Sequence, residues 1–278
     1  MESKDLYTVL NPVCRIVGGL YELKNSGGST FSNERVRVEM TAERVREGMD
    51  KLVCRWVNLS GERLVCQPEI RVRTAFVPTH RVIPAVSYDG NEWGHGKEPK
   101  GLMCGGEPWV FDDRRTSIPA CTVSENETAY FALMASDKDE VSHMASCSME
   151  KQEDGTVIHR LLWPEIERPM TYINRDRYGE AHEEFVTIPA GGTFTVTAWL
   201  LSGSPVLPNF AAANVEDAAL DLIDKPFEPR YSPEELIPLC CSFAKTLLQD
   251  VGGRKLFCIG FSPDGEGGFS QAWGSEFG

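Results

Sequence analysis

Apolar and polar residues alternate strictly along several stretches of this chain. Residues 35–40 read Arg-Val-Arg-Val-Glu-Met, and a period of two predicts a strand with one buried face. The run TFTVTAWLL over 193–201 has the same period. One of its faces is made of Phe194, Val196, Ala198 and Leu200, and the other of Thr193, Thr195, Thr197 and Trp199.

Turn-forming sequences separate the apolar runs. They are Ser60-Gly61, Asp154-Gly155 and Pro189-Ala190-Gly191-Gly192. The first predicts a hairpin or a long antiparallel pair, the second is typical of a tight hairpin, and the third joins a strand, turn, strand unit. The remaining predicted strands are 52–59, 62–77, 128–136, 142–149, 156–163 and 183–188. Many strands with few helices between them predict a large antiparallel β-sandwich.

The pattern becomes helical after about residue 205. Asn214 precedes a segment with apolar residues at helical spacing,. A Pro-rich stretch follows over 225–229, and Ser232-Pro233-Glu234-Glu235 matches a capping box with Pro at the first helical position,. This second helix is expected to run to about Asp250. We therefore predict a sandwich domain over 1–205, a linker with a short helix over 206–231, and the start of an incomplete helical domain over 232–278.

The last 19 residues, GFSPDGEGGFSQAWGSEFG, contain six Gly and four aromatic residues. A finished domain rarely ends in this way, so the chain is expected to be the N-terminal part of something longer or to be completed by a partner. A flexible native tail is the alternative. Exposed apolar side chains on the second helix and in this segment predict that the isolated chain self-associates.

Composition and net charge make several classes of protein function less favoured for this chain. The chain has 278 residues, with 28 Lys and Arg against 41 Asp and Glu, a net charge of −13. Duplex nucleic acid is disfavoured because phosphate contacts require clustered basic residues. The sequence contains neither a membrane-spanning run nor a secretory signal. Nine Cys, an odd number, favour reduced thiols in a cytoplasm,, and we expect Cys54, Cys66 and Cys121 to be small buried hydrophobes.

The most informative loop covers residues 88–118 and is rich in Gly, Trp and charged residues. Loops of this length are usually functional or disordered, and two Trp argue against disorder. Indole faces beside carboxylates and basic groups suit a sugar. The candidate substrate-binding residues are Asp89, Glu92, Trp93, His95, Glu98, Lys100 and Trp109. The alternative is a glycine-rich excursion that the two Trp anchor to the sandwich.

Other chemical motifs are weak. Asp112-Asp113-Arg114-Arg115 suits either a sugar clamp or an ion-pair network that anchors the loop. Glu165 and Glu167 are candidates for paired carboxylates, but solvated surface is the favoured interpretation. No nucleotide fingerprint, no nucleophile elbow and no His or Cys spacing typical of a metal site is present. We therefore expect no cofactor and no metal.

The order of parts resembles the N-terminal region of bacterial carbohydrate-active proteins of the six-hairpin glycosidase type, in which a β-supersandwich precedes an (α/α)6 barrel. The residues that carry the likeness are the Pro189-to-Phe194 turn into TVTAWLL, the helix near 215–224, and the terminal FSPDGEGGF. The resemblance implies a glycoside hydrolase whose catalytic carboxylates lie in a barrel beyond residue 278, so this chain alone would be inactive. Loop 88–118 would then contribute to the rim of the active site.

Three hypotheses remain open. The chain is the sandwich domain of a carbohydrate-active enzyme, a carbohydrate-binding module without chemistry of its own, or a structural sandwich that contacts a protein. Replacing Trp93 or Trp109 by Ala is expected to weaken sugar binding more than stability. An equal loss of folded protein would favour the anchoring role of the two Trp instead.

Overall fold

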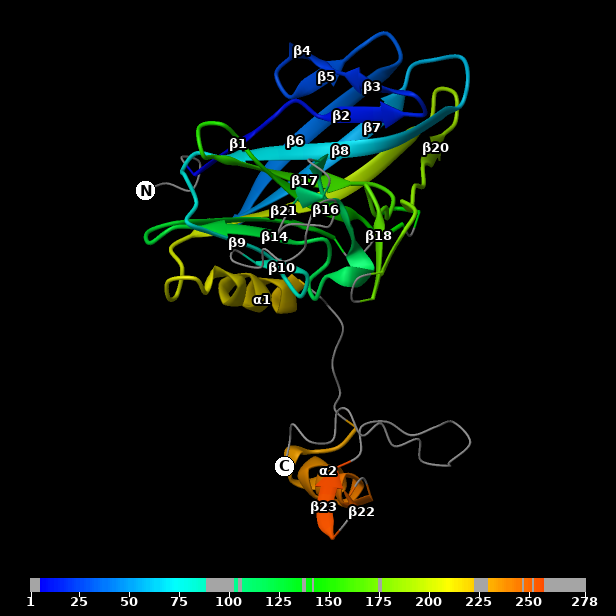
Figure 1. Ribbon diagram of the computed structural model, residues 1–278. Helices are drawn as coiled ribbons and strands as arrows, with labels where there is room; N and C mark the ends of the chain where they lie inside the picture. Colours follow the sequence, from blue (N-terminus) through cyan, green and yellow to red (C-terminus); the bar gives the residue numbers. More distant parts are fainter. Residues whose placement is uncertain are drawn as a thin grey trace. The chain divides into compact units, whose positions relative to one another are not determined.

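A computed structural model describes residues 6–88, 103–104, 107–136, 139–141, 143–174, 177–222, 230–246, 248–251 and 253–257. The chain divides into two compact units, Met1–Asp224 and Lys225–Gly278 (Figure 1). No helix among the described residues is long and apolar enough to cross a bilayer.

Two large antiparallel sheets form the first unit. In spatial order, the eight-stranded sheet contains β13 (Phe111–Asp112), β16 (Ser146–Lys151), β17 (Val157–Leu162), β8 (Leu64–Thr74), β2 (Val13–Ile16) and β3 (Gly19–Glu22), with β1 (Tyr7–Val9) and β20 (Val186–Ile188) also paired to β8. The nine-stranded sheet contains β10 (Ser87–Tyr88), β9 (His80–Ile83), β14 (Thr122–Glu125), β15 (Tyr130–Ala135), β21 (Thr193–Gly203), β7 (Met49–Asn58), β6 (Val36–Arg46), β5 (Thr30–Ser32) and β4 (Lys24–Gly27). The predicted antiparallel β-sandwich is confirmed.

One apolar core lies between the sheets. Every second residue of β8, including Cys66, Ile70 and Val72, enters it from one side. The predicted apolar face of β21 enters it from the other, with Phe194, Val196, Ala198 and Leu200 all buried. Alternation with a period of two thus places one face of each strand inside. Cys54, Cys66 and Cys121 are buried as expected.

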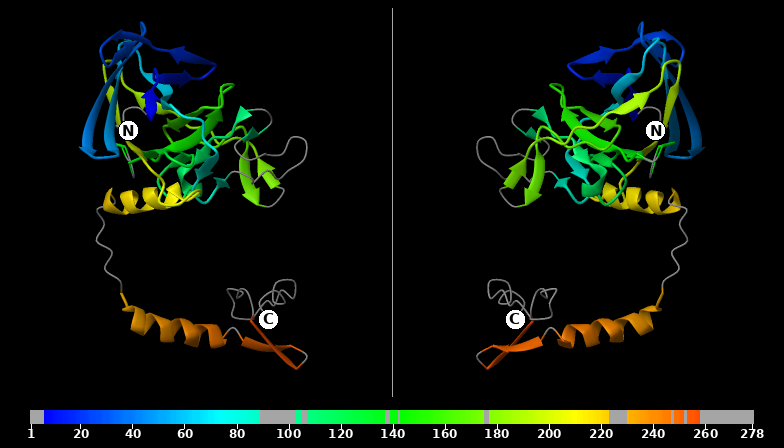
Figure 2. Two further views of the ribbon diagram at one scale, coloured as in Figure 1. Left: turned by 90° about the vertical axis from the view of Figure 1, so that its left-hand side faces the viewer. Right: turned by 90° about the vertical axis from the view of Figure 1, so that its right-hand side faces the viewer.

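α1 (Ala211–Leu222) covers the part of the other face of the nine-stranded sheet around β14 and β15, and lies along one side of the first unit (Figures 1 and 2). Its buried residues Ala211, Val215, Ala218 and Ala219 form a second core with side chains of β14, β15 and β21. The short helix predicted in the linker is therefore packed on the sandwich, within the first unit.

The second face of the eight-stranded sheet is polar. We call it the polar face, and its residues are Arg15, Gln67, Glu69, Arg71, Arg73, Asp112, Ser146, Ser148 and Arg160. Gln67 is fully buried and Glu69 is only 3% exposed, because irregular segments lie over them. Gln67 donates to the Glu184 carbonyl at 2.7 Å, and Ser148 donates to the Trp109 carbonyl at 2.9 Å.

The turn at Ser60-Gly61 does not make a hairpin. It joins β7 of one sheet to β8 of the other, and residues 189–192 likewise join β20 to β21 across the sandwich. The prediction of a pair between 52–59 and 62–77 is therefore wrong. Alternation gives the faces of a strand but not the sheet to which it belongs. Asp154-Gly155 does form the predicted hairpin, between β16 and β17.

Asn58 holds the two crossovers together. Its side-chain amide donates to the carbonyls of Glu62, Ile188 and Pro189 at 2.7, 3.0 and 3.0 Å. Its side-chain oxygen accepts from the backbone and hydroxyl of Ser60 at 2.9 and 2.7 Å. Asn58 is fully buried, so its amide finds its hydrogen-bond partners in the two crossovers and not in water.

The second unit differs from the predicted start of an α/α barrel. α2 (Pro233–Thr246) begins at the expected capping box but ends four residues before Asp250. A hairpin of β22 (Leu248–Val251) and β23 (Arg254–Phe257) follows. Among the described residues of this unit, α2 is the one helix. Its apolar side chains Leu236, Ile237 and Phe243 are exposed, and self-association through them stays a prediction.

Replacing Asn58 by Ala is expected to lower the free energy of unfolding by about 2–4 kcal/mol, since a buried hydrogen-bond network between the two crossovers is lost. Urea unfolding of the purified chain measures this. Asn126→Ala is the matched control, because the Asn126 side chain accepts only from Thr128 and Ala129 within its own turn. Equal losses for both variants would contradict the crossover role of Asn58.

His159 predicts a specific acid sensitivity. Its ring is buried between the sheets, 2.8 Å from the Thr122 hydroxyl and edge-on to Phe131, and burial lowers its pKa to about 3. The unfolded chain, with a pKa near 6.5, binds a proton that the folded chain does not. The free energy of unfolding is therefore unaffected by this group above pH 6.5. Below pH 6.5 it falls by up to about 1.4 kcal/mol per pH unit until the pH reaches 3.

His159→Leu removes this proton binding. Urea unfolding of wild type and variant at neutral and mildly acidic pH is the measurement. The stability difference between the two proteins is expected to shift in favour of the variant as the pH falls. A difference that stays constant with pH would contradict the account.

Candidate functional site

A cleft of about 640 Å³ opens at the β13 edge of the polar face. It lies between the short 3-10 helix η2 (Asp113–Arg115) and the segment 167–182. That segment includes a small hairpin of β18 (Thr171–Asn174) and β19 (Arg177–Gly179). The residues that line the cleft are Asp112, Arg114, Arg115, Glu167, Thr171, Ile173, Gly179, Glu180, Ala181 and His182.

Asp112 is the N-cap of η2 and holds the guanidinium of Arg114 at the cleft. As the last residue of β13 it pairs with Ser146, and its carboxylate accepts from the Arg114 backbone at 2.9 Å. The Arg114 guanidinium donates to both carboxylate oxygens. This hydrogen bonding and the negative charge raise the pKa of Arg114. Arg114 is therefore a permanent cation, and its side chain is 60% exposed.

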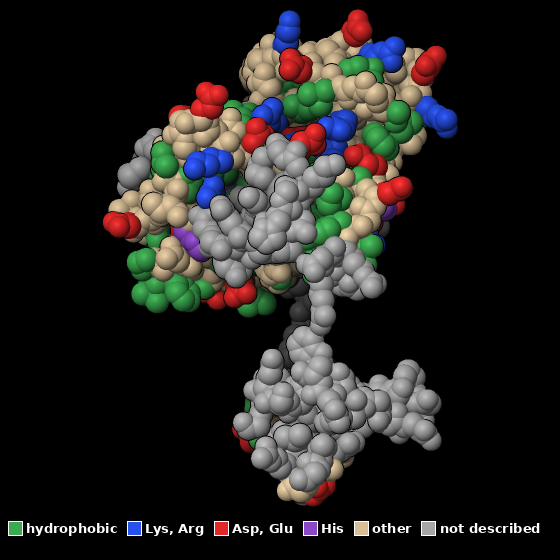
Figure 3. Space-filling model, in the orientation of Figure 1, with side chains coloured by type: hydrophobic (Ala, Val, Ile, Leu, Met, Phe, Trp, Pro, Cys, Tyr) green, Lys and Arg blue, Asp and Glu red, His purple; other side chains and the backbone are tan. Residues whose placement is uncertain are grey.

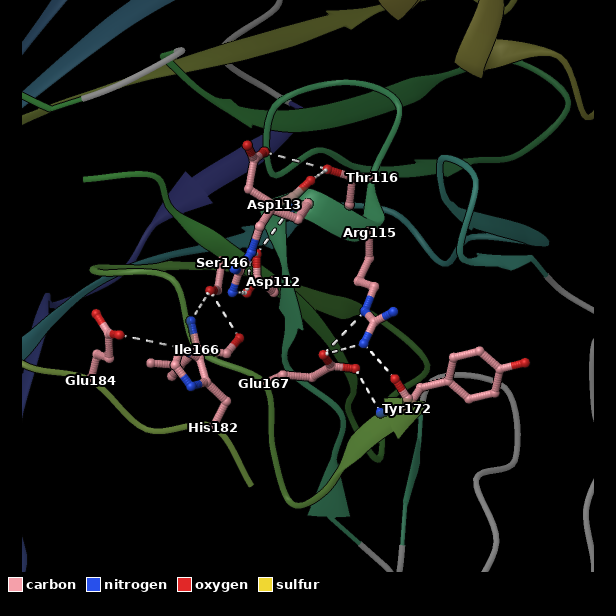
Figure 4. Close-up of polar contacts among 11 residues, drawn as sticks. Asp112, Asp113, Arg115, Thr116, Ser146, Ile166, Glu167, Tyr172, His182 and Glu184 are labelled. Atoms are coloured by element: carbon pink, nitrogen blue, oxygen red, sulfur yellow. Dashed lines mark hydrogen bonds and ion pairs between the residues drawn. The ribbon is translucent and has the colours of Figure 1, made fainter. Parts of the chain in front are cut away.

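Arg115 contacts Glu167 and the Tyr172 backbone (Figure 4). Its Nε and Nη2 both donate to Glu167 Oε2 at 3.1 Å, and Nη2 also donates to the Tyr172 carbonyl. Glu167 Oε1 accepts from the Tyr172 backbone at 3.0 Å. The Glu167 side chain is 3% exposed. These contacts tie η2 to the start of β18 and leave the Glu167 carboxylate fixed at the cleft.

Backbone pairing brings His182 to the same wall. Glu167 and His182 exchange two backbone hydrogen bonds of 2.9 and 2.8 Å. The His182 ring nitrogen Nε2 lies 3.5 Å from Glu184 and has no hydrogen-bond partner within the described part of the chain. Ser146 closes the base of this region through two bonds with Ile166, at 2.6 and 3.0 Å.

The cleft thus offers fixed donors and acceptors side by side. Arginine supplies planar donors, carboxylates supply acceptors, and Thr171 and His182 can do either. Ile173, 56% exposed, adds an apolar patch to the wall. Groups of three or more metal-ligating side chains do not occur among the described residues. The arrangement suits an uncharged or weakly charged ligand with several hydroxyl groups.

Of the seven predicted substrate-binding residues, the structure describes Trp109. Its side chain is 4% exposed and belongs to the main core, and its ring stacks on Phe111 with centroids 4.9 Å apart. Truncating so buried a ring is expected to cost stability first, contrary to the sequence-based expectation for Trp109. Asp89, Glu92, Trp93, His95, Glu98 and Lys100 lie outside the described residues.

Ion pairs of the network expected for Asp112-Asp113-Arg114-Arg115 are present, and Asp112, Arg114 and Arg115 line the cleft. The expectation of a solvated surface is wrong for Glu167, because η2 and β18 bury it. Sequence reasoning missed Thr171, Glu180 and His182. No local motif marks them, since only the pairing of residue 167 with residue 182 brings them to the cleft.

No protein-family model and no curated protein matches the chain. Similar solved structures include a provisionally assigned aldose 1-epimerase from Escherichia coli K12, with a TM-score of 0.39 and 10% identity over 71% of this chain and 68% of that one. Another from Klebsiella pneumoniae has a TM-score of 0.38 and 7% identity, over 76% and 57%. The galactosidase domain of an α-galactosidase–sucrose kinase has a TM-score of 0.23 and 12% identity, over 71% and 28%. All three TM-scores lie below 0.5, so the ligand of this chain is inferred from its own residues.

Glu167→Gln is expected to lower the free energy of unfolding by about 1–3 kcal/mol, because the half-buried Arg115 loses its charged partner. Urea unfolding measures the loss. Glu39→Gln is the matched control: Glu39 pairs with Arg37 and Arg55 on an exposed strand face, where a pair contributes about 0–1 kcal/mol. A loss no larger than that of the control would contradict the role of Glu167 in holding the cleft.

Proposed function

We propose that the first unit is a carbohydrate-binding β-sandwich domain and that the cleft beside η2 holds the sugar. The observation that carries the proposal is the set of fixed partners in one cleft, with Arg114 and Arg115 as donors and Asp112 and Glu167 as acceptors. A sugar hydroxyl both donates and accepts, so it needs such partners next to each other. The cleft volume, about 640 Å³, falls in the usual range for small-ligand sites,.

The finer proposal is that this domain serves a glycoside hydrolase-like protein, as the six-hairpin glycosidase resemblance implies. Hydrolysis of a glycoside requires one carboxyl group that gives a proton to the leaving oxygen. Asp112 and Glu167 are each engaged by an arginine, which supports binding rather than proton transfer in this cleft. Catalytic carboxylates would then come from another domain. A non-catalytic binding module is the second candidate, supported by the same contacts.

A cytoplasmic location is also proposed. Seven cysteines of the described part of the chain are free thiols, five of them buried, which agrees with a reducing compartment.

Isothermal titration of the full chain with D-galactose, D-glucose and their methyl glycosides tests the sugar site. At least one sugar is expected to bind, and Arg114→Ala is expected to weaken binding by about tenfold or more. Arg114→Ala also leaves the buried Asp112 carboxylate without its arginine, so a lower Tm is expected and the titration is run well below it.

Arg55→Ala is the matched control, since Arg55 is an exposed arginine paired with Glu39 on the nine-stranded sheet. It should bind sugar as the wild type does. Absence of binding for every sugar, or equal weakening by the two variants, would contradict the proposal.

A further inference from the structure

The polar face carries a second group of charges, around Gln67 and Glu69 of β8. Arg15 of β2 lies opposite Gln67 of β8, and Arg160 of β17 lies opposite Arg71 of β8. Arg160 is well paired, since its Nε and Nη2 donate to the two oxygens of Glu69 at 2.6 and 3.0 Å. The neighbouring arginines are not.

Arg168 is buried without a good partner. Its side chain is 9% exposed, and its Nη1 lies 3.4 Å from the Gln67 oxygen and 3.5 Å from Glu183. Both distances exceed those of a strong charge-assisted hydrogen bond. A guanidinium has five N–H donors, and the described residues give Arg168 no further side-chain acceptor. Glu183 itself is already bound at 2.9 Å by the Gln67 amide.

Arg15 increases the positive charge at this point. Burial, followed by the charge of Arg15, lowers the pKa of Arg168, and Arg160 acts in the same direction. Arg15 is exposed, and no side-chain partner for it occurs among the described residues. Two like charges held together cost free energy unless an opposite charge joins them. Such a concentration of arginines is unexpected in a chain with a net charge of −13.

Basic (Lys or Arg) and acidic side chains lie next to one another in Figure 3. Arg15, Arg71, Arg160 and Arg168 lie in this region with Glu69, Glu150 and Glu183, and one bidentate pair, between Arg160 and Glu69, is formed among them. Arg71 also lacks a hydrogen bond at its buried Nε, which is 3.9 Å from Glu69. The region therefore has guanidinium N–H donors that lack a close acceptor among the described residues.

We propose that Arg15 and Arg168 form a subsite for an oxyanion, the carboxylate or phosphate group of a ligand bound at the polar face. A planar guanidinium binds either group in bidentate fashion. The subsite goes beyond the proposed sugar cleft and does not depend on it, because a free anion is sufficient to occupy it. If both sites are used together, the ligand is an acidic or phosphorylated sugar.

Thermal unfolding of the full chain in sodium phosphate, sodium acetate and sodium chloride of equal ionic strength is the test. Phosphate or acetate is expected to raise the Tm above that in chloride by roughly 2–4 °C. Whichever of the two does so identifies the oxyanion. If neither does, the proposal is overturned, whatever the result with neutral sugars.

Arg15→Ala should abolish this rise, whereas Arg55→Ala should retain it. In chloride the Arg15→Ala Tm is expected to equal or exceed that of the wild type, since the variant relieves repulsion. An unchanged rise in Arg15→Ala, or a lower Tm of this variant in chloride, would overturn the proposal.

Discussion

Two sheets share one apolar interior, and each therefore has a second face with its own environment. The second face of the nine-stranded sheet is apolar around β14 and β15, where α1 covers it, and carries exposed charged residues on β6 and β7. The eight-stranded sheet presents glutamine, glutamate and arginine instead, under irregular segments that bring their own polar groups. This difference between the faces decides where binding chemistry is found.

Burial of the polar face has a cost, because each charge there loses water. Pairing with carboxylates offsets this desolvation cost, and three arginines are paired to different degrees. Arg160 and Glu69 form a bidentate pair, Arg115 and Glu167 form a pair that also fixes β18, and Arg168 is left with two long contacts. Ligand groups can compete where pairing is weakest or most exposed, at Arg114 in the cleft and at Arg168 beside it.

Sequence patterns identified the strands that have one apolar face, and β21 agrees residue by residue. They did not show that β7 and β8 belong to different sheets, because residues 59–63 look the same in a hairpin and in a crossover. The crossover depends on Asn58, whose side-chain amide donates to the carbonyls of Ile188 and Pro189, 130 and 131 residues further along the chain. The burial of Glu167, a residue that the sequence placed on a solvated surface, was missed for a similar reason, since it depends on Arg115 and Tyr172 and not on its neighbours in sequence.

The central claim is that ligands bind at the polar face of the eight-stranded sheet. NMR of the arginine Nε–Hε groups during titration with D-galacturonate, a sugar that carries a carboxylate, tests it most directly. The account predicts shifts at Arg114, Arg115, Arg15 and Arg168, with none at Arg37 and Arg55 of the opposite sheet. Shifts confined to Arg37 and Arg55, or shifts of equal size at all six arginines, would contradict it.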